Sequence, residues 1–140
     1  MSTEQNKAVM RRVFEEVLSK GNLAIIPDII APNYVFHSPF GMEIKGPEGF
    51  KKNVAVYRKA FPDLRAEIKD IIAEGDKVAV RYVMTGTFKG EMMGTAPTGK
   101  RLEITGAVFI RFERGKEVEA SSHLDMLAWN RQLGIPIPAA

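Results

Sequence analysis

The spacing of apolar residues changes once along this chain, and that change limits the fold more than any other feature. As far as Phe61 the apolar residues recur three or four positions apart, as on one side of an α-helix. From Leu64 onward they alternate with polar residues, as on a half-buried β-strand. Helices therefore come first and strands follow, which predicts an α+β fold with the helices on one face of a sheet.

Helix boundaries are marked by capping residues and by proline. Ser2 and Gln5 fit a capping box at the start of the first helix, and Gly21 is suited to end it. A later helix begins near Pro47, because proline is tolerated at the first helical position, and it ends at Phe61. Both helices carry one apolar stripe, so each is expected to pack against the sheet.

Two tight turns join the predicted strands. The Gly-Asp pair after Glu74 makes a two-residue hairpin loop and places Asp70 opposite Arg81. The Arg-Gly pair after Glu113 makes another and places that glutamate opposite Lys116. Both cross-strand pairs are of opposite charge, which supports these registers. Arg81 is therefore interpreted as a partner of an ion pair rather than as a group that binds substrate.

Four strands joined mainly by hairpins predict a curved antiparallel sheet. Wrapped around the N-terminal helices, such a sheet forms a cone-shaped barrel whose mouth is a natural ligand cavity. The whole chain, residues 1–140, is expected to be a single domain. Residues 135–140 are expected to be an irregular tail, because prolines interrupt them.

Composition excludes several classes of protein. The net charge is only +3, and the basic residues are interspersed with acidic ones, which argues against a nucleic-acid-binding face. There is no cysteine, and so no disulfide, thiolate nucleophile or Cys-ligated zinc. The polar N-terminus lacks the apolar segment of a signal peptide, and no apolar run reaches the roughly 18 residues of a membrane span. We expect a cytoplasmic protein that binds neither nucleic acid nor membrane.

The last strand, within residues 116–130, carries the strongest signal for chemistry. If the alternation runs unbroken from the turn, His123 and Asp125 share one face, roughly 7 Å apart, and Gly106 lies opposite the histidine and leaves space there. Apolar neighbours such as Trp129 favour a raised pKa for the carboxyl. We therefore predict that Asp125 faces the interior and transfers protons. The alternative is an aspartate that caps the following helix.

The other histidine, His37, ends the extended apolar segment that begins at Tyr34. A single histidine beside aromatic residues is more often structural than catalytic, so both interpretations of His37 stay open on its sequence context.

Several segments together resemble a known family. They are YVFHSPFG, the FPDL that follows the later helix, AEGDKVAVR, the G-x-x-PTGK pattern and the D-x-L-x-x-x-R-Q-L-G ending. The chain resembles the SnoaL-like polyketide cyclases, which belong to the nuclear-transport-factor-2-like superfamily of α+β cones. The resemblance covers nearly the whole sequence, although this fold hosts many different reactions.

The resemblance implies a cofactor-independent acid/base enzyme that acts on a hydrophobic carbonyl compound, by an intramolecular aldol cyclisation or an isomerisation. Asp125 would be the general acid/base, and His37 matches a histidine often found in the family's pocket. His123 is the third candidate catalytic residue. No metal, flavin or nicotinamide is implied. The residues expected to bind the substrate are Phe14, Tyr57, Phe61, Ser121 and Trp129.

One position departs from the family pattern. Members often carry tryptophan four residues before the aspartate, where this chain has Ser121, and serine there is expected to widen and polarise the pocket.

Two alternatives are kept. A dehydratase similar to scytalone dehydratase would use both histidines with Asp125 and a tyrosine, Tyr34 or Tyr57. A non-catalytic module would hold a small hydrophobic molecule or serve in dimerisation.

The first hairpin also bears on assembly. Both of its faces carry apolar residues, such as Ile68 and Ile72 on one and Val80 and Tyr82 on the other. The helices of the same chain can cover only one face, and large exposed apolar patches are uncommon on soluble monomers. We therefore predict a homodimer, or a higher homo-oligomer, formed through the outer face of the sheet.

Overall fold

The order of helices and strands is the one that the change of spacing predicts, and the α+β class is confirmed. The structure is a computed structural model and describes residues 2–136. The helices are α1 (Thr3–Arg12), η1 (Val13–Ser19, a π-helix), η2 (Leu23–Ile25, a 3₁₀ turn), α2 (Ile26–Ile29), α3 (Gly46–Ala60) and α4 (Met126–Leu133). The strands are β1 (Ile30–His37), β2 (Glu43–Lys45), β3 (Arg65–Glu74), β4 (Lys77–Thr87), β5 (Arg101–Glu113) and β6 (Lys116–Leu124).

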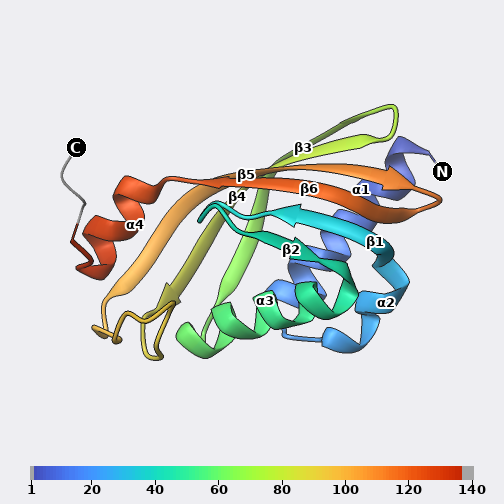
Figure 1. Ribbon diagram of the computed structural model, residues 1–140. Helices are drawn as coiled ribbons and strands as arrows, with labels where there is room; N and C mark the ends of the chain where they lie inside the picture. The colour runs from blue at the N-terminus through green and yellow to red at the C-terminus, as the bar shows by residue number, and fades with distance from the viewer. Residues whose placement is uncertain (1, 137–140) are drawn as a thin grey trace.

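All six strands form one sheet, in the order β2-β1-β6-β5-β4-β3 (Figure 1). Two expectations are corrected here. The sheet is mixed rather than antiparallel, because β1 pairs with β6 in parallel, and its two outermost strands do not meet to close a barrel. The segment that ends in His37 joins the sheet as β1 because its backbone groups pair with β6 on one side and with β2 on the other.

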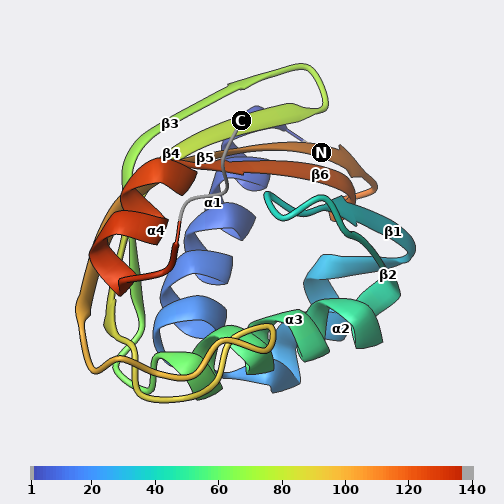
Figure 2. The same ribbon diagram turned by 60° about the vertical axis from the view of Figure 1, so that its left-hand side comes forward.

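The sheet curves around the N-terminal helices, and the core lies on its concave face. Figure 2 shows α1 inside the curve with α3 beside it, while α4 lies at the end of β6. Alternate residues of β4 and β5 are buried and face the helices, as the two-residue repeat predicts. The largest completely buried side chains include Trp129, Tyr34, Phe61, Phe88 and Leu102.

Both predicted turns and the registers next to them are confirmed. Glu74 lies opposite Lys77, and Nε of Arg81 is 2.6 Å from Oδ2 of Asp70. Glu113 lies opposite Lys116.

Beyond its turn, the last hairpin departs from the predicted register. Phe112 faces Glu117, but the next residue of β5, Arg111, faces Glu119, so a β-bulge leaves Val118 without an opposite residue. Because of this one extra residue, every later side chain of β6 points to the face opposite the one predicted. Gly106 therefore lies opposite Leu124 rather than His123, which corrects the predicted pairing.

The first helix starts with the predicted capping box. The side chain of Ser2 accepts a hydrogen bond from the backbone N–H of Gln5, whose side chain bonds back to the backbone of Ser2. After Arg12 the helix widens into η1, which ends at Ser19; Gly21, two residues later, has φ of +75°, as is common just past a helix end.

At the other end of the chain, Ile135 and Pro136 have no regular secondary structure, as predicted, and residues 137–140 lie outside the described part. Within residues 2–136, no helix is long and apolar enough to cross a membrane.

Candidate functional site

A narrow cavity of about 100 Å³ lies between the concave face of the sheet and the helices. Its walls come from α1, η1, β1, α3 and the inward faces of β3 to β6. Phe36, Pro39 and Leu124 are among its partly exposed lining residues. The remaining lining residues are Met10, Val13, Phe14, Leu18, Tyr34, Phe50, Asn53, Val54, Tyr57, Leu64, Ala66, Tyr82, Met84, Val108, Glu117, Ala120 and Ser122.

The lining is apolar except for a few groups. The hydroxyls of Tyr82 and Ser122 lie 3.2 Å apart and share a hydrogen bond across β4 and β6. Burial raises the pKa of Tyr82, and the bond from Ser122 opposes that rise. Burial also raises the pKa of Tyr34, as does the nearby charge of Glu117. These phenols therefore stay neutral near pH 7 and can donate hydrogen bonds to a carbonyl oxygen.

Glu117 is the one carboxyl that lines the cavity among the described residues. It is 2% exposed, and its Oε2 has no hydrogen-bond partner within residues 2–136. Burial raises its pKa to about 8, because the charged form loses its solvation. Sequence reasoning did not select this residue, although the turn register already placed it opposite the apolar Phe112. That pairing was the signal for an inward-facing carboxyl.

Asp125 does not face the cavity, so the predicted orientation is wrong. The residue is exposed and ends β6 as the N-cap of α4, where Oδ1 accepts a hydrogen bond of 3.0 Å from the backbone N–H of Ala128. The alternative left open by the sequence, a capping aspartate, is the arrangement that the structure has. Its part in a reaction stays a prediction.

The predicted polar partners of Asp125 also lie outside the cavity. Because of the bulge, His123 and Ser121 are on the outer face of β6, and the ring of His123 packs edge-on against Phe109 at a centroid distance of 6.4 Å. Ser121 therefore does not widen the cavity, contrary to expectation.

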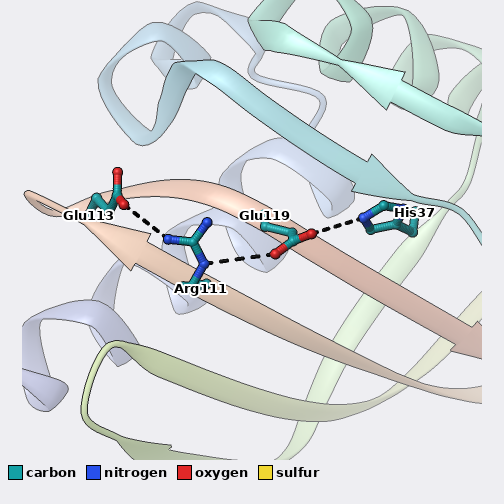
Figure 3. A network of polar contacts seen from close by, with 4 residues as sticks. All are labelled: His37, Arg111, Glu113 and Glu119. Atoms are coloured by element: carbon teal, nitrogen blue, oxygen red, sulfur yellow. Dashed lines mark hydrogen bonds and ion pairs between the residues drawn. The ribbon is translucent and has the colours of Figure 1, made fainter.

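His37 belongs to a chain of polar contacts at the surface of the sheet (Figure 3). Its Nε2 lies 3.1 Å from Oε2 of Glu119, whose other oxygen is 3.8 Å from Nε of Arg111. The arginine also donates a hydrogen bond of 3.0 Å to Glu113. The hydrogen bond with His37 lowers the pKa of Glu119. The structure therefore does not bring His37, His123 and Asp125 together at the cavity.

The predicted substrate-binding aromatic residues divide into two groups. Phe14 and Tyr57 line the cavity, and Phe14 packs against Tyr82 at a centroid distance of 5.1 Å. Phe61 and Trp129 lie in the core behind it, with their centroids 5.7 Å apart. Trp129 also contacts Tyr57 edge-on, so it supports the cavity wall rather than forming it.

A second, larger hollow of about 500 Å³ lies on the outer face of the sheet. Its large exposed apolar residues are Ile72 and Phe109, which are 69% and 58% exposed. Lysine, arginine and glutamate side chains surround them, among them Lys77 and Arg111. This open surface has no buried polar group to orient a small molecule, so the inner cavity is the candidate active site. Within residues 2–136, no group of three or more His, Asp or Glu side chains is placed to hold a metal ion.

Comparison with known proteins supports the resemblance seen in the sequence. The model of the SnoaL-like polyketide cyclase family matches residues 8–133. The chain belongs to the SnoaL-like polyketide cyclase family.

Named relatives agree with this family. Aklanonic acid methyl ester cyclase AcmA from Streptomyces galilaeus is 35% identical over 140 residues, which cover 97% of this chain and 94% of AcmA. The crystal structure of IdmH, a putative polyketide cyclase from Streptomyces antibioticus, is 31% identical with a TM-score of 0.80, over 93% of this chain and 99% of IdmH. AclR, described as a putative hydroxylase from Streptomyces galilaeus, is 32% identical with a TM-score of 0.83, over 99% of this chain and 87% of AclR. Relatives named as cyclases support an enzymatic function for this SnoaL-like chain.

Proposed function

We propose that this chain is a cofactor-independent cyclase that closes a ring in a polyketide-derived carbonyl compound by an intramolecular aldol reaction. The observation that carries this proposal is the apolar cavity with the Tyr82 and Ser122 hydroxyls on its wall. An aldol reaction develops negative charge on a carbonyl oxygen, and fixed hydroxyl donors in an apolar site stabilise that charge. The 35% identity to a named cyclase supports the same reaction class.

The cavity favours an uncharged substrate. No Lys, Arg or His side chain lines it within residues 2–136, and its one acidic group is Glu117. An ionised carboxylate entering this cavity would lose its solvation without gaining a cation as partner. We therefore expect a methyl ester to be accepted in preference to the corresponding free acid.

The volume of the cavity limits what enters. A cavity of about 150 Å³ holds one benzene molecule, so about 100 Å³ accepts an open-chain carbonyl segment rather than a fused ring system. The segment that reacts would enter, and the rings of a larger polyketide would lie at the mouth against Phe36 and Pro39.

Aklanonic acid methyl ester is the probe that tests this proposal, by liquid chromatography and mass spectrometry of the products. We expect an isomer of unchanged mass and new retention time, formed at least tenfold faster from the ester than from the free acid. Ala120→Leu, which fills the cavity, should slow turnover strongly. Ala107→Leu adds the same volume on the outer face of β5 and should not.

Other products would contradict the proposal. A product lighter by one water would point to a dehydratase, and one heavier by an oxygen atom would point to a hydroxylase. Binding of the ester without any product would point to a non-catalytic module.

We further propose that the outer hollow is the contact between two copies of the chain. A twofold axis brings the same patch of both copies together, which requires a self-complementary surface. This patch meets the requirement, because exposed Ile72 and Phe109 lie beside cations such as Arg111 and anions such as Glu119.

Light scattering at micromolar concentration should therefore give twice the 15.6 kDa of one chain. Phe109→Lys should shift the particle toward the monomer, since it places two like charges at the centre of the contact. Val56→Lys changes an exposed apolar residue of α3 and is the matched control. A wild-type monomer would exclude this assembly.

A further inference from the structure

Glu117 is a buried carboxyl that makes no hydrogen bond through Oε2 to any part of the chain that the structure describes. Its Oε2 is unpaired within residues 2–136, and the cavity that it lines is also lined by apolar residues such as Met10 and Phe50. Burying a polar group without a hydrogen bond costs free energy, so such groups are rare in native structures and need an explanation. A role in proton transfer to or from a bound ligand explains an unpaired carboxyl on the wall of a cavity.

The bulge in β6 separates this carboxyl from the next glutamate of the strand. Glu117 lies opposite Phe112 of β5 and beside Ile30 of β1, on the side of the sheet that the helices cover. Two residues later, beyond the bulge, Glu119 points outward to His37. Two glutamates that a regular strand would place on one face are thereby separated, one facing the cavity and one facing solvent.

We propose that Glu117 is the catalytic acid/base group of the cavity, which takes a proton from the carbon next to a carbonyl group and returns it to the product. The inference rests on the proposed cyclase function and adds the residue that moves the proton.

The proposed step is balanced without any other reactant. The carboxylate of Glu117 takes the proton from the α-carbon, and the electrons of that C–H bond form the enolate. The enolate carbon attacks a second carbonyl carbon of the same molecule, so that a C–C bond forms as the C=O π bond breaks. The resulting alkoxide takes the proton from the Glu117 carboxylic acid. The product is an isomer of the substrate, and the carboxylate is restored.

The test compares Glu117→Gln with a matched control, Glu119→Gln, which makes the same change on the outer face of the same strand. Glutamine keeps the shape of the side chain but cannot take a proton. Cyclisation of the methyl ester should fall about a hundred- to ten-thousand-fold in Glu117→Gln, the usual contribution of general acid–base catalysis, and stay within about threefold in the control. Equilibrium binding of the ester should be nearly unchanged in both variants.

A second reaction separates this inference from the proposed function. Pentan-3-one is a small open-chain ketone with CH₂ groups beside its carbonyl but no second carbonyl to attack, so its deuterium uptake from D₂O reports proton abstraction alone. Wild-type exchange that Glu117→Gln abolishes, without cyclisation of the ester, would refute the proposed function and support the role of Glu117. Wild-type cyclisation that Glu117→Gln leaves intact would refute the role of Glu117 alone.

A pH profile of the wild type gives the same answer without any variant. The rate of cyclisation and the rate of deuterium exchange should both rise with pH to a plateau. The midpoint of each rise should lie at the Glu117 pKa of about 8. The other titratable groups on the cavity wall are tyrosines, among them Tyr57 and Tyr82, whose pKa values burial raises further above 10. Loss of activity in Asp125→Asn but not in Glu117→Gln would overturn the inference, as would a wild type that neither cyclises nor exchanges.

Discussion

At pH 9, Glu117→Gln should be more stable to urea than the wild-type chain by about 4 to 5 kcal/mol, and this advantage should fall below about 1 kcal/mol at pH 5. The reason is the burial of the carboxyl. Its pKa rises from 4.5 to about 8 on folding, and one pKa unit corresponds to about 1.36 kcal/mol. Most of the change that Glu117 causes in the free energy of unfolding therefore occurs between pH 5 and pH 9.

The sign follows from where the proton is held. Between pH 4.5 and about 8, the folded chain keeps the proton of Glu117 while the unfolded chain has released it. The folded state then binds more protons, so stability falls as the pH rises through this range and levels off above about 8. Glutamine resembles the protonated carboxyl and does not titrate, so the variant escapes this loss.

Urea unfolding curves at several pH values measure the difference directly. Other groups that titrate between pH 5 and 9 contribute equally to both proteins, so they cancel when the two curves are subtracted. Glu103→Gln, at an exposed glutamate of β5, should follow the wild type through this range. Parallel pH dependence of the wild type and Glu117→Gln would show that Glu117 titrates normally and would remove the basis of its proposed role.

Much of the fold could be predicted from local sequence. The capping box of Ser2 and Gln5 and the two hairpin turns depend on residues close together in the chain, and all are confirmed. Opposite charges across the first turn also predicted the pairing of Asp70 with Arg81 correctly. Contacts of this kind need no knowledge of distant segments.

The parallel pairing of β1 with β6 could not be predicted in the same way. His37 pairs with Ser121 across more than half of the chain, and no turn or local repeat specifies that register. The short segment that ends in His37 has no clear alternation, so its place in the sheet depends on tertiary packing.

The bulge explains why the predicted orientations of His123 and Asp125 are wrong. The alternation of inward and outward side chains predicted from the Arg114 turn is correct as far as Glu117. Val118 has no residue opposite it, and this one extra residue reverses the alternation. His123 and Asp125 were therefore assigned to the wrong face, and Glu117, the last residue before the reversal, was overlooked. Phe14 and Tyr57 were selected without reference to that strand, and both line the cavity; their part in binding a substrate stays a prediction.

Measuring the pKa of Glu117 is the most direct test of whether the cavity holds a carboxyl that is neutral near pH 7 and can transfer protons. The side-chain carboxyl carbon of Glu117 can be followed by NMR during a pH titration of the wild type and assigned by its absence from Glu117→Gln. We expect its signal to titrate with a midpoint of about 8 rather than 4.5. The exposed carboxyl of Glu119 in the same spectra should titrate below its ordinary pKa, because His37 bonds to it. A midpoint near 4.5 for Glu117 would mean that water or a partner solvates it, and would contradict this account of the site.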